Sequence, residues 1–296
     1  MPARLRVATR GSELARAQTD AVIARLGVDA EIVLVSTTGD QRTDAPIHTL
    51  GGTGVFVKEV QEAVLAGDAD IAVHSAKDLP SLCAPGLVIG AVPERGDVRD
   101  ALVGSTLAEL PAGARVGTGA VRRRAQLAAA RPDLEFGELR GNIGTRLEKA
   151  AGFDAVVVAA VALERLGLAA RIAERLDPTV MLPQVGQGAI AVECRADDDR
   201  VRALLAAADD ADAHTAVATV RAFLAQLGGG CNLPCGALAG VVDDGVEITV
   251  LLASLDGRTV LRARASGTDP AAVGVEAARR LLDEHGGRSL LEDVTP

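Results

Sequence analysis

Short apolar segments alternate with helical patterns along most of this chain, and this alternation most constrains its fold. It predicts strands joined by helices that cover both faces of a mostly parallel sheet. In the first half, the predicted strands span 5–8, 31–36, 70–75 and 87–92. The predicted helices span 12–26, with Ser12 as the N-cap, and 57–66, ending before Gly67.

The same rhythm begins again after the charged stretch 93–100. Strands are predicted at 115–117, 134–139 and 154–159, and helices at 120–130 and 143–151. The strand DAVVVA is apolar after its first residue, which is typical of a strand buried on both faces. A later apolar segment, 189–194, has no helix before it that would begin a new domain. We therefore expect this segment to return to the first sheet, which makes the first domain discontinuous.

The pattern changes from about residue 212 onward. A helix at 213–227 ends at three glycines, strands at 246–253 and 259–265 are joined by a turn, and a last helix begins at 270 and ends near 283. These elements predict an α+β domain. The fold is thus expected to be α/β, with two domains of mostly parallel sheets around a cleft, plus a C-terminal α+β domain. The expected boundaries are 1–93 with 189–206, then 99–182, and finally 211–296.

The composition excludes several classes of function. The 296 residues include 40 acidic and 31 basic side chains, and the resulting net charge of -9 disfavours nucleic acid and anionic membrane surfaces as partners. The first residues form no apolar signal segment, and the apolar run 155–163 is far shorter than the roughly 20 residues that span a membrane. The four cysteines lack zinc-binding spacing and suit a reducing compartment. We expect a cytoplasmic monomer without a metal.

Arginines gather where predicted strands lead into predicted helices. The segments TGAVRRR (118–124) and RGNIGTR (140–146) each open a helix, and Arg10 with Ser12 follows the first strand. Helix N-termini attract anions, and arginine binds a carboxylate or phosphate through two parallel hydrogen bonds. A single arginine is more often a solvated surface charge, which we expect of Arg124 because adjacent helical residues point about 100° apart. The repetition at strand ends predicts a cleft for a ligand with several negative groups.

A second polar group, HSAKDLP (74–80), lies at the end of a predicted strand. A carboxylate such as Asp78, beside the ammonium of Lys77, stays ionised and can stabilise a developing cation. The alternative is that Asp78 only caps a turn before Pro80. His74 has apolar neighbours and is expected to be structural.

Two glycine-rich loops remain. GGTGVF (51–56) lacks the spacing of a dinucleotide or phosphate-binding loop, and its long polar approach predicts a movable lid. GGCNLPC (229–235) places Cys231 between glycine and proline, where an exposed thiol could serve for covalent attachment. A buried free cysteine is the commoner alternative. Without a GxSxG motif or a metal-spaced cluster, the chain is a poor candidate for a serine hydrolase or a zinc enzyme.

Eight segments of the chain, in this order, resemble the porphobilinogen deaminase family, also called hydroxymethylbilane synthases. They are ATRGS, TTGD, GGTGVFVKE, DIAVHSAKDLP, GTGAVRRR, LRGNIGTRLEK, LPQVGQGAIAVECR and GGCNLP. The resemblance extends over essentially the whole chain. It implies two periplasmic-binding-protein-like α/β domains that face a cleft, and an α+β domain that carries a cofactor cysteine.

The resemblance also implies a transferase of porphyrin and heme biosynthesis. Such an enzyme joins four porphobilinogen molecules with loss of ammonia and releases the linear tetrapyrrole hydroxymethylbilane. It starts from a dipyrromethane cofactor, held here by a thioether to Cys231. Asp78, beside Lys77, would stabilise the cation left when ammonia departs. The ligand carboxylates would pair with Arg10, Arg122, Arg123, Arg140, Arg146 and Arg165, while Ser12, Ser75, Lys77, Thr118 and Gln187 would hold the cofactor or shape the cleft, and Phe56 would cover the site.

The chain departs from the family pattern in three places. Thr53 stands where many members have lysine, Gly119-Ala120 where two serines are usual, and Cys235 where an aliphatic residue is usual. Cys235 raises the question of which thiol carries the cofactor, and the glycine before Cys231 together with its motif match favours Cys231. Thr53 and Gly119-Ala120 raise the alternative of a non-catalytic anion-binding or sensor protein, such as a degenerate paralogue. The presence of both Cys231 and Asp78 favours the transferase, because a protein that only binds would need neither.

Overall fold

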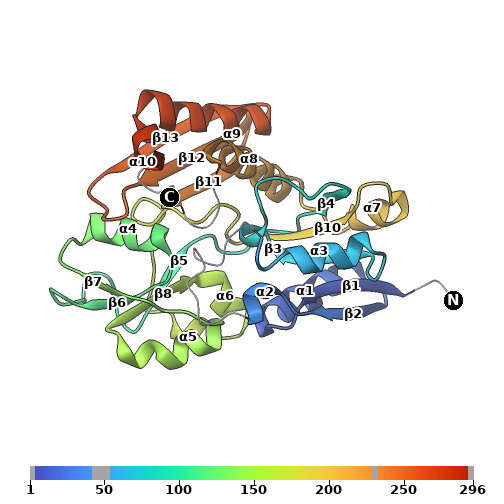
Figure 1. Cartoon of the computed structure of the whole chain (residues 1–296), viewed down its shortest axis with the longest axis horizontal. Helices are drawn as coiled ribbons and strands as arrows, with labels where there is room; N and C mark the ends of the chain where they lie inside the picture. Colours follow the sequence, from blue (N-terminus) through green and yellow to red (C-terminus); the bar gives the residue numbers. More distant parts are fainter. Residues whose placement is uncertain (1–3, 42–53, 229–232, 293–296) are drawn as a thin grey trace.

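The structure, a computed structural model, describes residues 4–41, 54–228 and 233–292. Its first sheet has the strand order β2-β1-β3-β10-β4 (Figure 1). The strands are β1 (Leu5–Arg10), β2 (Ala30–Val35), β3 (Ile71–Ser75), β4 (Leu87–Ala91) and β10 (Ile190–Arg195). β1 pairs in parallel with β2 and β3, whereas β10 pairs antiparallel with both β3 and β4. The late apolar segment of the chain thus lies inside the first sheet.

The second sheet repeats this plan with the order β7-β6-β8-β5-β9. Its strands are β5 (Asp100–Val103), β6 (Arg115–Gly117), β7 (Glu135–Gly137), β8 (Ala155–Ala159) and β9 (Glu174–Arg175). β5 takes the antiparallel position that β10 takes in the first sheet. Each antiparallel strand begins where the chain arrives from the other sheet, first after 92–99 and later after 183–189. These two connections are called the first and second crossover below.

The sequence predicted four of the α-helices described in the two α/β domains, those near 12–26, 57–66, 120–130 and 143–151, and did not predict those at 38–41, 160–165 and 199–205. The helices of these domains are α1 (Glu13–Leu26), α2 (Thr38–Gln41), α3 (Lys58–Leu65), α4 (Val121–Ala130), α5 (Ile143–Lys149), α6 (Ala160–Arg165) and α7 (Asp199–Leu205). The predicted cap of α1 is confirmed, since the hydroxyl of Ser12 accepts a hydrogen bond from the backbone N–H of Ala15 at 3.3 Å. At the other end, Gly27 stops the helix with a left-handed backbone, φ 64°.

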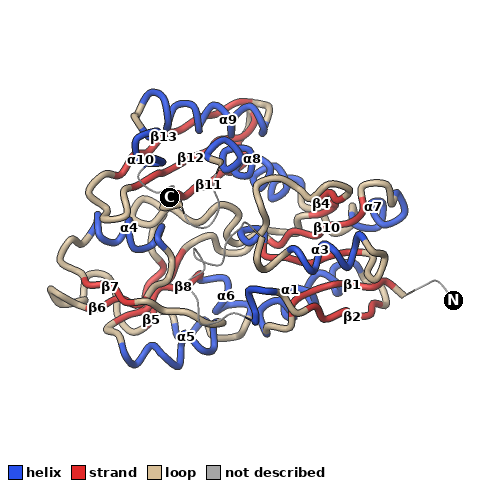
Figure 2. The backbone as a smooth tube through the Cα atoms, viewed as in Figure 1, coloured by secondary structure: helices blue, strands red, loops and turns tan. Residues whose placement is uncertain are grey.

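The third unit is a three-stranded meander covered by helices (Figure 2). It comprises α8 (Ala211–Leu227), β11 (Cys235–Val242), β12 (Gly245–Ala253), β13 (Val260–Gly267), α9 (Pro270–Arg279), a π-helical turn (Arg280–Glu284) and α10 (Gly287–Glu292). α8 and α9 pack closely, because a Cβ on Gly274 of α9 would lie 2.4 Å from the carbonyl oxygen of Thr219. The unit is therefore an α+β domain with its own aliphatic core around Phe223.

The fold class expected from the sequence is confirmed: two α/β domains with mixed, mostly parallel sheets precede a separate α+β domain. The strand 154–159 is buried at all five positions of β8, as its apolar composition indicated. The numerical domain boundaries stay a prediction. Within the described residues, no helix is long and apolar enough to cross a membrane.

Candidate active site

Lys77 and Asp78 form a single 3₁₀ turn, Ala76–Asp78, directly after β3. The preceding residue, Ser75, exchanges side-chain hydrogen bonds with Gln18 of α1 at 3.0 and 3.1 Å. Across from this turn lies α6 of the second domain. A small cavity of about 10 Å³ lies between the two domains here, and Ser75, Lys77 and Arg165 are among the residues that line it. The pair therefore lies where the two α/β domains meet.

The charges around Lys77 come from its own 3₁₀ turn and from β5, α4 and α5. Burial is the largest cause that lowers the pKa of Lys77, to about 8, and the cations of Arg123 and Arg146 lower it further. The carboxylates of Asp78 and Asp100 act in the opposite direction. Tertiary folding thus brings the predicted carboxylate, the predicted lysine and two predicted arginines within electrostatic range of one another.

Arg146 extends this cluster toward Arg140. Its Nε donates to the carbonyl oxygen of Gly141 at 2.8 Å, which bends the side chain back over the start of α5. Burial first, and then the charges of Arg123 and Arg140, lower the pKa of Arg146 to about 10, opposed by Asp78. One guanidinium nitrogen of Arg140, Nη1, is buried without a hydrogen-bond partner. These cations are thus held close together with unused hydrogen-bonding capacity.

Arg122 and Arg123 open α4 and are both buried, at 4% exposure each. Arg123 donates to Asp100 Oδ1 from Nε and Nη2 at 3.0 and 2.8 Å, and to the carbonyl oxygen of Val157 from Nη1 at 3.0 Å. Arg122 donates from Nη1 to the carbonyl oxygen of Leu182 at 2.7 Å. Its Nη2 also lies 2.8 Å from Asp100 Oδ2. Arg124, by contrast, is exposed, as predicted.

Three further predicted residues support the cluster through the backbone. Gln187 donates to the carbonyl oxygen of Val98 at 2.8 Å, and Arg165 donates to that of Gly188 at 2.8 Å. The hydroxyl of Thr118 accepts from the N–H of Ala120 at 3.2 Å.

A Cβ at Gly119 would lie 2.9 Å from the carbonyl oxygen of Leu139, so a serine there would force the backbone apart. Glycine at this family departure is required by close packing.

Arg10 and Phe56 contact each other. The guanidinium of Arg10 lies 4.3 Å from the centre of the Phe56 ring and also forms an ion pair with Asp40, donating from Nε to Oδ2 at 3.2 Å. Phe56 packs beside a buried group that includes Ala76 and Leu79, the neighbours of Lys77 and Asp78 in sequence. The lid role of Phe56 stays a prediction.

The cysteines differ in accessibility. Cys235 is buried at the start of β11, at 5% exposure, and Cys194 is buried in the first domain, where burial raises the pKa of its thiol. Cys83 is exposed. Cys231 and Thr53, two residues singled out in the sequence, lie outside the described residues.

The structural role expected of His74 stays a prediction. His74 is buried, and its Nε2 lies 3.1 Å from a carboxylate oxygen of Glu193 on the neighbouring strand β10. Gln61 of α3 donates to both oxygens of the same carboxylate, at 3.1 and 2.8 Å. This group ties a helix to two strands inside the first domain.

Three charged residues that contact predicted site residues were not identified from the sequence: Asp100, Asp40 and Arg95. Asp100 is the last residue of the charged stretch 93–100 and the first residue of β5, DALV. Arg95 donates to the carbonyl oxygen of Gln187 at 2.9 Å, and burial lowers its pKa to about 10. Nothing local in the sequence distinguished Asp100 or Arg95 from their charged neighbours.

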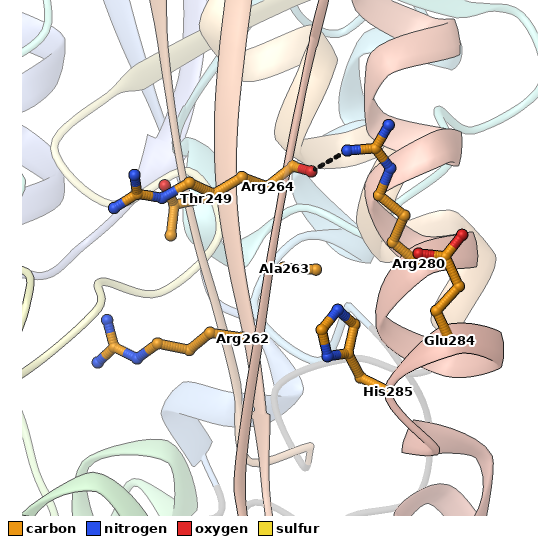
Figure 3. A pocket seen from close by; sticks show the side chains of 7 residues that line it. All are labelled: Thr249, Arg262, Ala263, Arg264, Arg280, Glu284 and His285. Atoms are coloured by element: carbon orange, nitrogen blue, oxygen red, sulfur yellow. Dashed lines mark hydrogen bonds between the residues drawn. The ribbon is translucent and has the colours of Figure 1, made fainter.

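A larger groove of about 450 Å³ lies on the C-terminal domain. Figure 3 shows that its side chains diverge: Arg262 and Arg264 extend to one side of β13, while Arg280 and His285 lie on the other. Arg262 donates to the carbonyl oxygen of Thr179 and Arg280 to that of Arg264, at 2.7 and 2.8 Å. The groove lacks the converging charges seen around Lys77.

Comparison with known proteins covers nearly the whole chain. Residues 5–203 match the family domain described as porphobilinogen deaminase, dipyromethane cofactor binding domain, and residues 215–283 match the porphobilinogen deaminase C-terminal domain. A porphobilinogen deaminase of Roseiflexus sp. (strain RS-1) is 48% identical over 296 residues, 96% of this chain and 97% of that protein. The Syntrophobacter fumaroxidans porphobilinogen deaminase is 44% identical over 302 residues, 98% of this chain and 97% of that protein.

Among solved structures, the VFT2 domain of Bordetella pertussis BvgS covers 69% of this chain and 85% of its own, with 20% identity and a TM-score of 0.40. The family matches carry the assignment, since both family domains are present in order and the relatives align from end to end. The chain therefore belongs to the porphobilinogen deaminase family, enzymes of tetrapyrrole biosynthesis that bind a dipyrromethane cofactor and polymerise porphobilinogen.

Proposed function

We propose that this protein joins four porphobilinogen molecules, each with loss of ammonia, and releases hydroxymethylbilane after addition of water. We further propose that the dipyrromethane cofactor is attached by a thioether to Cys231, and that the enzyme is a cytoplasmic monomer that needs no metal, nucleic acid or membrane. The observation that carries the proposal is the gathering of Lys77, Asp78, Arg123 and Arg146 where the two α/β domains meet.

The residues of this region fit a ligand with several carboxylates. Arg122 Nε and Arg140 Nη1 are buried and lack hydrogen-bond partners, and a carboxylate oxygen would satisfy each of them. Arg140, Arg146 and Lys77 would hold the acetate and propionate groups, together with Arg10 and with Arg165, which lines the same small cavity as Lys77. Ser12, Ser75, Thr118 and Gln187 would shape the walls. A small cavity of about 10 Å³ lies beside Lys77, between residues of the two α/β domains.

Asp78 would act directly on the reaction. When ammonia leaves the aminomethyl group of porphobilinogen, the substrate becomes a cation, and a carboxylate near its ring nitrogen lowers the energy of that cation. Lys77 and the arginines would hold the substrate in place through its carboxylates. The bound cofactor supplies the first pyrrole to which a substrate unit is added.

Cys231 is favoured over Cys235 as the attachment site. Cys235 lies in the core of the C-terminal domain, with the next two positions of β11 also buried, and its thiol is shielded from a bulky adduct. A protein that only binds anions would need neither a reactive cysteine nor Asp78.

Intact-protein mass spectrometry tests the proposal directly. From a cell that makes porphobilinogen, the wild-type protein is expected to carry the added mass of two linked pyrroles, and Cys231→Ala to have the bare polypeptide mass. Cys235→Ala is the matched control and should keep the adduct. A bare wild-type mass, or an adduct retained in Cys231→Ala, contradicts the proposed attachment.

Substrate binding is expected to weaken as pH rises through about 8. The pKa of Lys77 is about 8, so its ammonium is present below this value and is lost above it. Because a charged hydrogen bond to a ligand carboxylate disappears, KM should rise up to about tenfold between about pH 7 and pH 9. Lys77→Arg stays charged and should show a flat KM over this range. Steady-state kinetics of both proteins test this, and parallel pH profiles would refute it.

A further inference from the structure

One carboxylate outside the predicted site holds two of its arginines. Asp100 begins β5 and is fully buried, at 0% exposure. Its Oδ1 accepts two hydrogen bonds from Arg123, and its Oδ2 lies 2.8 Å from Nη2 of Arg122. We propose that Asp100 is a positioning residue that fixes Arg122 and Arg123 in the orientation in which they receive ligand carboxylates, an inference that rests on the function proposed above.

A bridging carboxylate is needed because the two arginines are neighbours in sequence. Consecutive residues of a helix diverge by about 100°, and two like charges in a buried place repel each other. Here both guanidinium groups turn toward one carboxylate, and each has a second anchor on a different backbone carbonyl: Leu182 for Arg122 and Val157 for Arg123. Asp100 is thus the shared contact that makes the two side chains converge.

The pair keeps a positive charge after this contact. One carboxylate faces two guanidinium groups, and the Nε of Arg122 stays buried without a partner. Lys77 also lies within electrostatic range of both Asp100 and Arg123. Asp100 therefore offsets part of the charge of the pair, and the positive charge that remains still attracts a ligand with several carboxylates.

Asp100 is itself held by the second crossover. Gln187 donates to Asp100 Oδ1 at 3.1 Å and to the carbonyl oxygen of Val98 at 2.8 Å. Gly96 donates its N–H to the carbonyl oxygen of Gly188 at 3.2 Å, so the two crossovers run side by side next to this carboxylate. The orientation of the arginine pair is therefore set by the segments that connect the two domains.

The test compares Asp100→Asn with the matched control Asp97→Asn. Asp97 lies three residues earlier in the first crossover and also contacts two arginines, Arg99 at 2.7 Å and Arg175 at 3.2 Å, but those arginines are partly exposed. Asp100→Asn should keep the wild-type circular dichroism spectrum and lose kcat/KM by about 100-fold, as expected for a displaced binding group. Asp97→Asn should keep the wild-type kinetics.

Sulfate provides a readout that does not depend on turnover. With Asp100 neutralised, the arginine pair lacks its counter-ion, so sulfate should raise the melting temperature of Asp100→Asn at a concentration about tenfold lower than for wild type or Asp97→Asn. A merely structural role would lower stability without creating this response. An unchanged sulfate response, or wild-type kcat/KM in Asp100→Asn, overturns the inference.

If Asp100→Asn does not fold, Asp100→Glu tests the positioning role of Asp100 instead. It keeps the charge but is one methylene longer, so it should show the wild-type sulfate response with a raised KM; a wild-type KM overturns the inference. Failure of the proposed function would look different. The wild type itself would then lack both the cofactor mass and turnover, while sulfate-dependent melting would still report on Asp100.

Discussion

Asp78→Asn is expected to keep the fold and lose most of the turnover. The substitution removes one negative charge and almost no volume from the 3₁₀ turn after β3. A group that stabilises charge developing in a transition state contributes on the order of 10²–10³ in rate, so kcat should fall by about that factor. KM should change much less, because the arginines and Lys77 still bind the substrate carboxylates. Single-turnover consumption of porphobilinogen measures the effect.

Asp20→Asn is the matched control for this change. Asp20 is exposed on α1 of the same domain, and we expect its loss to leave kcat and KM unchanged. The cofactor mass should be checked in both variants, so that a defect in elongation is separated from a defect in cofactor assembly. Elongation by Asp78→Asn at nearly the wild-type rate would show that Asp78 only caps the turn before Pro80.

Arg123→Met is expected to cost about 3 kcal/mol of folding free energy at neutral pH, because removal of one partner of a buried ion pair leaves a buried charge poorly compensated. The change removes two hydrogen bonds to Asp100 and one to the carbonyl oxygen of Val157. Arg124→Met is the control at the next position. Arg124 is exposed, with its guanidinium 5.9 Å from the Phe136 ring, and its loss should cost less than about 0.5 kcal/mol. Urea unfolding of both variants measures the difference.

The stability gap between wild type and Arg123→Met should narrow in acid. Burial acts to raise the pKa of Asp100, but the charges of Arg122 and Arg123 outweigh it and hold the pKa at about 2, below the ordinary value of 3.8. A carboxyl group with a lower pKa in the folded state stabilises the fold above about pH 4, and this contribution is lost as pH falls toward 2. Arg123→Met has less of this stabilisation at neutral pH, because it lacks one of the two cations that lower the pKa of Asp100. It therefore loses less than the wild type as the pH falls. An equal gap at neutral and acidic pH would show that Asp100 is not the partner responsible.

The regular elements of the α/β domains were predictable where the local pattern was long. The strand 154–159 and the helix capped by Ser12 needed only apolar composition and a capping residue. β5, β9 and β11 were missed, and each had a local reason. β5 has four residues and begins with the last residue of a charged stretch, β9 has two residues, and β11 begins within the segment GGCNLPC, whose glycines and proline disfavour the prediction of a strand. Their pairing comes from neighbouring strands that are distant in sequence.

The residues of the site could be predicted from the sequence, but the contacts between them could not. The arginines at strand ends and the Lys77–Asp78 turn could be named from the sequence, because strand-to-helix turns and glycine leave a local signal. The contact between Arg123 and Asp100 could not be predicted, because Asp100 lies 23 residues away in sequence and is one of several charged residues in its segment. The same holds for Arg10, whose contacts with Asp40 and Phe56 cross 30 residues or more of chain.

The sequence by itself determined the fold class, the order of the elements, and the family to which the segments from ATRGS to GGCNLP belong. Local periodicity, caps and glycines carry that information within a few residues. Only the tertiary structure decided which charges meet. Two crossovers bring Asp100 and Gln187 beneath α4, where burial strengthens each electrostatic contact and turns two adjacent arginines toward one carboxylate. Which side chains converge on Asp100 depends on distances in the folded structure, and these distances cannot be read from the spacing of residues along the chain.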